Sequence, residues 1–216
     1  MSERRMTASE RRRQLVDIGK QVFAELGYDG ASVEEIASRA GVSKPIVYEH
    51  FGGKEGLYAV VVDRESAQLL DMIAGRLGPG IGARQQVHAS AMAFLDYIEE
   101  NPDGFRVLIR DSPSFTGGGM AGLLSDVANK AEDILAGFFK PVGLPVETAG
   151  LYAQALVGMV VRVGAWWSEE RGLPKEVVAD HLTALAYGGL SRLPRNPSRH
   201  ARFREIPAPP AATPSA

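Results

Sequence analysis

Apolar residues recur three or four positions apart along most of this chain, which is the spacing of one face of an α-helix. No segment convincingly alternates apolar and polar residues as a half-buried strand does. The pattern predicts two short helices between residues 32 and 52, another short helix over 103–110, and longer helices over 9–26, 54–77, 83–100, 120–139, 147–170 and 176–193. We therefore expect an all-α protein.

Helix start and stop signals follow one another closely after the first long helix. Ser32, with Glu35 three residues later, forms a capping box that satisfies free backbone donors. Gly41 supplies the left-handed residue that ends this helix, Ser43 caps the next, and Pro45 is tolerated in its first turn. Two short helices joined by a tight turn indicate a helix-turn-helix, whose second helix enters the major groove of DNA.

The second short helix has two distinct sides. At about 100 degrees per residue, Val47 and Phe51 share one side and are expected to pack inward. Lys44, Pro45 and Tyr48 lie on the adjacent side, so a cation, a rigid apolar ring and a phenol face outward. Such groups suit a groove lined with phosphates, thymine methyl groups and base edges.

Residues 41–57, GVSKPIVYEHFGGKEGL, resemble the DNA-binding signature of the TetR/AcrR family of transcription regulators over nearly its whole length. The resemblance implies that Lys44, Pro45 and Ile46 meet base edges. It places the other DNA contacts, mostly to phosphates, at Ser32, Ser43, Tyr48, His50 and Lys54. Glu34 lies beside this set and either accepts a hydrogen bond from a cytosine amino group or faces solvent.

The fold implied is an N-terminal three-helix DNA-binding domain followed by a C-terminal helical domain that binds an effector and dimerises. The segment 78–82, GPGIG, interrupts the helical pattern, and from Pro194 the chain is rich in Pro, Arg and Ala. We expect a DNA-binding domain (1–53), a connecting helix (54–78), an effector-binding and dimerisation domain (79–193) and a disordered tail (194–216).

Charge is placed locally rather than globally. The formal net charge is −2, which excludes a protein that coats DNA through overall basicity. Basic residues gather ahead of the motif, at Arg4, Arg5, Arg11, Arg12, Arg13 and Lys20. The arginines from Arg4 to Arg13 form either an arm that becomes ordered on DNA and contacts phosphates or the minor groove, or a solvated, frayed N-terminus.

Several classes of site are disfavoured by the residues present. The chain contains no cysteine, so thiol nucleophiles, disulfides and thiolate metal sites are excluded. The four histidines are scattered without metal-ligand spacing, and no catalytic motif is present. We expect no enzyme activity, cofactor or metal. Without a signal peptide or a sufficiently long apolar span, we expect a protein of the cytoplasm, associated with the nucleoid and not with a membrane.

The last two helices carry stripes of small and apolar residues. The stripes are Ala155, Gly158, Arg162 and Ala165 in one helix, and Val178, Leu182, Leu185 and Gly189 in the other. In the family, these helices form a four-helix bundle across a two-fold axis, which implies a homodimer; the alternative is packing within one chain. A buried Arg162 requires a partner, such as Asp96, Asp111, a ligand anion or interface water.

The C-terminal half also holds aromatic, methionine and arginine residues of the kind that line an effector pocket. The candidates are Phe94, Tyr97, Arg110, Met120, Met159, Arg162 and Trp166. Ordinary helical core is the alternative for each of them. The resulting hypothesis is a ligand-responsive regulator, most often a repressor in this family, that binds a palindromic operator as a dimer. A DNA-binding regulator without an effector is the main alternative, and an enzyme acting on a small apolar substrate is a weaker one.

Overall fold

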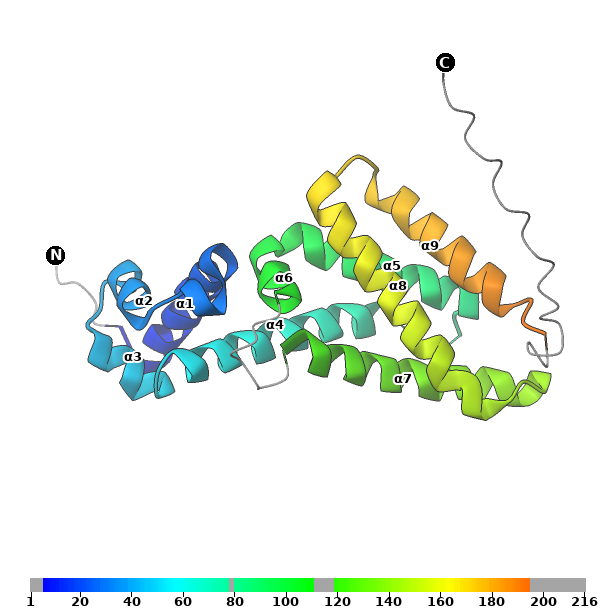
Figure 1. Cartoon of the computed structure of the whole chain (residues 1–216), viewed down its shortest axis with the longest axis horizontal. Helices are drawn as coiled ribbons and strands as arrows, with labels where there is room; N and C mark the ends of the chain where they lie inside the picture. The colour runs from blue at the N-terminus through cyan, green and yellow to red at the C-terminus, as the bar shows by residue number, and fades with distance from the viewer. Residues whose placement is uncertain (1–5, 78–79, 111–118, 195–216) are drawn as a thin grey trace, which may run out of the picture.

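The computed structural model describes residues 6–77, 80–110 and 119–194, and these ranges form α-helices and one short 3-10 helix without a strand. The all-α prediction is therefore confirmed for the described residues. The elements, labelled in Figure 1, are α1 (Ala8–Gly30), α2 (Val33–Ala40), α3 (Lys44–Phe51), α4 (Lys54–Arg76), α5 (Ala83–Glu100), α6 (Pro102–Ile109), α7 (Gly119–Val142), η1 (Val146–Thr148), α8 (Ala149–Glu170) and α9 (Lys175–Leu190).

The ends of α1 follow local sequence signals. Glu10 donates its backbone N–H to Thr7 Oγ1 at 3.2 Å, and Thr7 donates its own to Glu10 Oε2 at 2.8 Å, which completes a capping box. The hydrogen bonds that the Thr7 backbone N–H and hydroxyl donate to the Glu10 carboxyl lower its pKa. Near the other end, Gly27 has φ of 72°, so regular helix stops there although one irregular turn continues to Gly30.

Helices α1, α2 and α3 gather at one end of the molecule, as Figure 1 shows in blue. Fully buried apolar side chains from each of these helices and from the start of α4 meet between them: Leu15, Val22, Ile36, Val47 and Leu57. Gly19 allows α4 to approach α1 closely, because a Cβ there would lie 3.0 Å from Leu57. This unit is the scaffold that presents α3.

Helix α4 connects this unit to the rest of the chain (Figure 1). Its buried residues Leu57, Val61 and Leu69 belong to one continuous apolar core that also includes residues of α1, α2, α3, α5, α6, α8 and α9. The N-terminal unit and the C-terminal helices therefore share a core through α4, and they are not joined by a free linker.

In the C-terminal part, α5 packs against both α4 and α9, and α7 and α8 form a helical hairpin (Figure 1). A small second core of Leu135, Phe139, Ala149 and Ala153 holds this hairpin together. Helix α8 approaches α5 at Gly164, where a Cβ would lie 2.3 Å from Phe94 Cε1. A side chain at this position is excluded by the packing.

The structure differs from the sequence expectations at some helix ends. Helix α7 runs through Pro141 to Val142, although Pro141 has no backbone N–H to donate to the carbonyl four residues earlier. Helix α9 ends at Leu190 rather than at residue 193. Arg4, Arg5 and residues 195–216 of the expected tail lie outside the described residues.

Candidate DNA-binding interface

The turn between α2 and α3 is built by local backbone chemistry. Ser32 is the N-cap of α2, and its Oγ accepts the backbone N–H of Glu35 at 3.1 Å. Gly41 ends α2 in the left-handed region, with φ of 64°. Ser43 occupies the N-cap position of α3, but its side chain makes no capping hydrogen bond. The predicted helix-turn-helix is therefore present, with one of its expected side-chain caps missing.

Helix α3 is held in place by groups from α1 and α4. Arg12 of α1 donates to the carbonyl of His50 at 2.6 Å, and its guanidinium lies 4.4 Å from the centre of the Phe51 ring. Gly56 of α4 lies so close that a Cβ would be 2.0 Å from the Phe51 carbonyl oxygen. With Val47 fully buried, these contacts leave the opposite side of α3 free to face outward.

The outward side of α3 carries the predicted base-reading residues. Lys44 and Pro45 are exposed and Ile46 is half-buried against the core. Tyr48 is 54 % exposed, and its ring edge lies beside Gly53, where a Cβ would be 3.4 Å from Tyr48 Cε1. The structure thus brings a cation, an apolar ring and a phenol together on one surface.

Lys44 is not free in the isolated chain, because it forms an ion pair with Glu34 of α2. This hydrogen bond to Lys44 lowers the pKa of the Glu34 carboxyl. The Lys44 side chain is 50 % and the Glu34 side chain 59 % exposed to solvent. Phosphates or base edges must therefore compete with Glu34 for the Lys44 ammonium.

Lys54 is already occupied by structural contacts. Its Nζ donates to the carbonyls of Tyr28 and Ala31 at 2.9 and 3.2 Å, and it lies 4.4 Å from the centre of the Tyr28 ring. These contacts tie the start of α4 to the segment that joins α1 and α2. His50 is half-buried beside Phe51. The phosphate roles of Lys54 and His50 stay predictions.

The expected effector residues that the structure describes lie in different environments. Phe94 is buried edge-to-face against Phe105, and Tyr97 is fully buried with its hydroxyl on Glu65. Arg110 donates to backbone carbonyls of α1. Met159 packs against the core, whereas Arg162 and Trp166 are exposed on α8, and the Met120 side chain lies outside the described residues.

Arg162 has the opposite environment from the one expected. It is exposed, and no ion pair with a described residue is formed. Asp96, considered as its partner, instead pairs with Arg76 and with Lys175, the latter at 2.7 Å. Lys175 also pairs with Glu99. The expected buried charge is therefore absent from the single chain, because that face of α8 is uncovered.

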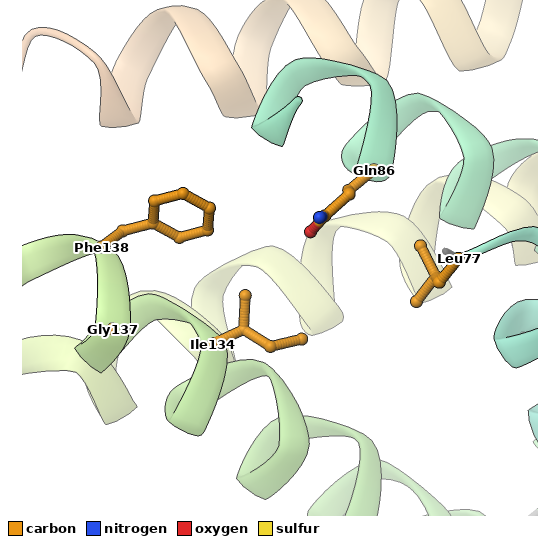
Figure 2. A pocket seen from close by; sticks show the side chains of 5 residues that line it. All are labelled: Leu77, Gln86, Ile134, Gly137 and Phe138. Atoms are coloured by element: carbon orange, nitrogen blue, oxygen red, sulfur yellow. The ribbon is translucent and has the colours of Figure 1, made fainter. Parts of the chain in front are cut away.

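An open cavity of about 580 Å³ lies between the end of α4, the start of α5 and α7. Figure 2 shows Leu77, Ile134 and Phe138 around it, with the amide of Gln86 directed inward from α5 and Gly137 on the wall formed by α7. None of these five residues was expected from the sequence. The i, i+4 pair Ile134 and Phe138 was the available signal, but it also fits an ordinary helix core.

Among the described residues, no group of three or more His, Asp or Glu side chains could hold a metal ion. Two surfaces of the described residues offer potential for binding, namely the outward side of α3 and the cavity beside α7. The first is polar, cationic and convex, whereas the second is mainly apolar and concave.

Comparison with known sequences gives a consistent result over most of the chain. The family described as "Bacterial regulatory proteins, tetR family" matches residues 15–61, and "Tetracyclin repressor-like, C-terminal domain" matches residues 72–201. The HTH-type transcriptional activator FasR of Mycolicibacterium smegmatis is 32% identical over 192 residues, covering 88% of this chain and 87% of that protein. An HTH-type transcriptional repressor of Mycobacterium tuberculosis is 32% identical over 108 residues, covering 50% of this chain and 56% of that protein.

Solved structures share the same helical architecture. A TetR-like transcriptional regulator from Rhodococcus sp. RHA1 superposes with a TM-score of 0.72 at 25% identity, covering 88% of this chain and 100% of that one. The fatty acid degradation regulator FadR from Bacillus halodurans has a TM-score of 0.71 at 19% identity, covering 87% of this chain and 98% of that one. The latter likeness concerns the fold alone.

The Glu34–Lys44 ion pair generates a testable prediction. Glu34→Gln releases the Lys44 ammonium and is expected to strengthen DNA binding severalfold, with the slope of log affinity against log salt steeper by up to about 0.9 for one additional phosphate contact. Binding is measured by fluorescence anisotropy over a salt series. Asp133→Asn, the same charge change on the exposed side of α7, is the control. An equal increase in both variants, or an unchanged slope, contradicts competition between Glu34 and DNA.

Proposed function

The chain belongs to the TetR family of bacterial transcription regulators, and on this premise we propose that it binds a palindromic operator as a homodimer and leaves it when a small effector binds. The observation that carries the DNA-binding part is the outward side of α3, where Lys44, Pro45 and Tyr48 are exposed while Val47 anchors the helix in the core. In a dimer, two such helices enter successive major grooves about 34–36 Å apart.

A second copy of the chain is proposed to cover the outer face of α8 and α9. Leu151 and Leu185 are 69 and 66 % exposed in the single chain, which is unusual for leucine. No atom lies within 4 Å of a Cβ built at Gly158 or Gly189, so packing within the chain does not require glycine there. Close approach of a partner helix accounts for both features.

The two predicted stripes contribute unequally to this face. Val178 and Leu182 of α9 are buried within the chain and face α5, so they are not available to a partner. The segment Val146–Glu170 is long and apolar enough to span a membrane by length and composition alone. Its most apolar stretch of 18 residues has a mean hydropathy of 1.2, and only 17% of that stretch is buried. A dimer interface explains the same exposed apolar residues in a regulator that we place in the cytoplasm.

The cavity beside α7 is the proposed effector site. Its described lining is apolar apart from Gln86 and contains no charged side chain. The amide nitrogen of Gln86 already donates to the Ile81 carbonyl at 3.2 Å, which leaves its second N–H and its carbonyl oxygen for a ligand. This composition favours an effector that is largely apolar. Its volume of about 580 Å³ is within the range of small-molecule sites, ~300–1,000 Å³. We therefore move the proposed pocket from the residues expected by sequence to this cavity.

Repression is the proposed outcome where the operator overlaps a promoter, because the bound dimer then blocks RNA polymerase. Activation is the alternative, since FasR of Mycolicibacterium smegmatis carries the name of an activator and the Mycobacterium tuberculosis relative that of a repressor. Division into a DNA-binding domain (1–53), a connecting helix (54–78) and a C-terminal domain (79–193) remains part of this proposal.

DNA binding is tested by incubating the purified protein with sheared genomic DNA from its source organism and sequencing the retained fragments. We expect enrichment of a palindrome whose half-sites lie one helical turn apart. Tyr48→Ala is expected to weaken binding to that site by about 1–2 kcal/mol because an exposed contact of α3 is removed. Leu70→Ala, on the exposed side of α4 and away from both α3 and the proposed dimer face, serves as the control. Absence of an enriched palindrome, or unchanged affinity of Tyr48→Ala, contradicts the proposed interface.

The dimer is tested by introducing a charge into the exposed face of α8. Leu151→Glu is expected to convert the dimer to a monomer in sedimentation velocity without loss of helicity, because an unpaired carboxylate is costly in a buried interface. The control is Glu132→Gln, on an exposed part of α7. A wild-type protein that sediments as a monomer, or a Leu151→Glu variant that remains a dimer, rules out this face.

The effector site is tested by filling the cavity. A screen of apolar metabolites first identifies a compound that releases wild-type protein from its operator. Gly137→Phe, which adds a ring where space is open, is expected to retain operator binding while its response to the compound falls at least about tenfold, or 1.4 kcal/mol. Gly75→Phe adds the same group on an exposed part of α4. Normal release of Gly137→Phe would place the effector elsewhere.

A further inference from the structure

A polar cluster is buried where α1, α4, α5 and α6 meet. At its centre, Glu65 of α4 has no solvent exposure. Its Oε2 accepts a hydrogen bond from the Tyr97 hydroxyl at 3.1 Å and another from the Asn101 side-chain amide, and both donors belong to the end of α5. A carboxylate removed from water is stable only when charges and hydrogen bonds replace its solvation. Tyr97 and Asn101 supply part of that replacement.

Two cations complete the cluster. Arg64 Nη2 lies 3.1 Å from Glu65 Oε1 and Lys20 Nζ lies 3.5 Å from the same atom. Lys20 also donates to Asn101 Oδ1 at 2.9 Å, so one ammonium of α1 bonds to both α4 and α5. Asn101 lies at the N-cap of α6 but makes no side-chain cap there, because its Oδ1, the atom that would accept a backbone N–H, accepts from Lys20 instead. No buried side-chain nitrogen or oxygen among the described residues lacks a partner.

Helix α6 closes the cluster without contributing a side chain. A Cβ at Gly104 would lie 2.2 Å from Glu65 Oε2, 2.5 Å from Asn101 Nδ2 and 2.7 Å from the Tyr97 hydroxyl. The backbone of α6 therefore occupies the space next to all three polar groups. Any rotation or translation of α6 toward the cluster collides with them, and movement away opens them to water.

The other end of α6 is also attached to α1. Arg110, the C-cap of α6, donates from Nη1 to the carbonyls of Ala24 and Glu25 at 3.2 and 3.3 Å. These carbonyls lie just before Gly27, where the regular helix of α1 ends. The first turn of α6 thus lies next to the Lys20–Asn101 hydrogen bond, and Arg110 at its other end is bonded to the end of α1.

The phenol of Tyr97 acts as a permanent donor in this arrangement. Burial, followed by the neighbouring Glu65 carboxylate, raises the pKa of Tyr97, so the hydroxyl keeps its proton at physiological pH. The cluster consequently has a fixed pattern of donors and acceptors, and it is satisfied only while α1, α4 and α5 keep their present positions.

We propose that the Glu65 cluster is a latch that fixes the α1–α3 unit against α5 and α6, and that displacement of α5 or α6 opens it. Lys20 cannot stay bonded to Asn101 if α5 shifts relative to α1, and the loss leaves Glu65 with less charge compensation in a buried site. The proposal therefore has two arrangements: a latched one, in which Lys20 bonds to Asn101, and an open one, in which this bond is broken and water reaches Glu65. Helix α5 links the latch to the cavity, since Gln86 lies near its start and Tyr97 and Asn101 at its end.

The latch goes beyond effector binding and is tested without effector or DNA, so its failure is distinguishable from failure of the proposed function. Because the full-length chain contains no cysteine, Glu49→Cys on α3 and Glu176→Cys on α9 allow selective attachment of two spin labels at exposed sites. Distances between the labels are measured by pulsed electron resonance, with labelled chains diluted in unlabelled protein so that each dimer contains one labelled pair.

Two variants disrupt the latch in different ways. Lys20→Met removes the ammonium that joins α1 to α5 and leaves Arg64 on Glu65. Gly104→Ala pushes α6 away from the cluster. Asp63→Asn, a carboxylate-to-amide change on the exposed side of α4, is the matched control. Circular dichroism and thermal unfolding establish that each variant is folded.

For wild type and Asp63→Asn, we expect one narrow distance distribution. For Lys20→Met and Gly104→Ala, we expect a shifted distribution or a second population. A folded Lys20→Met variant that keeps the wild-type distribution, with only a lower melting temperature, overturns the latch and leaves the cluster a merely stabilising contact. A shift of equal size in Asp63→Asn overturns it as well. If Gly104→Ala fails to fold, Lys20→Met decides alone.

Discussion

The requirement to compensate a buried carboxylate determines how the two parts of this molecule meet. Glu65 lies in the middle of α4, the helix that both parts share, and it is fully removed from solvent. Its partners come from helices before and after α4 in the sequence: Lys20 lies in α1, and Tyr97 and Asn101 lie at the end of α5. An apolar contact of similar size tolerates small shifts, whereas these directional bonds do not. The relative position of α1, α4 and α5 follows from this constraint.

Presentation of the recognition surface depends on the same scaffold. Helix α3 has only eight residues and is too short to be stable alone. It is held by the buried Val47, by Arg12 on its last turn, and by the close backbone approach of Gly56. Since α1 and α4 provide these supports, any change in their mutual position moves the residues that face DNA. In the proposed mechanism, regulation therefore acts on the orientation of this surface, and the residues that form the surface stay the same.

The C-terminal helices show the opposite property, because several apolar side chains remain uncovered in the single chain. The outer face of α8 and α9 and the cavity beside α7 both expose leucine, isoleucine or phenylalanine. Covering such surfaces with a second copy or an apolar ligand releases free energy of about 25 cal/mol per Å² of apolar area. Exposed apolar surface is thus available for dimerisation and for ligand binding, and α5 connects both with the buried cluster.

The sequence by itself determined the helices, the helix-turn-helix and the family, because these depend on local signals: the capping box at Ser32, the left-handed Gly41, and the periodicity of apolar residues. It could not assign the partners of long polar side chains. Asn101 precedes Pro102 at the start of α6, a usual place for a capping side chain, yet it bonds to Lys20 and Glu65 instead. Arg162 was expected to be buried and is exposed. Helical spacing shows which residues share a face but not what that face meets. Only the tertiary packing, which brings residues far apart in the sequence together, decided the buried cluster and the cavity.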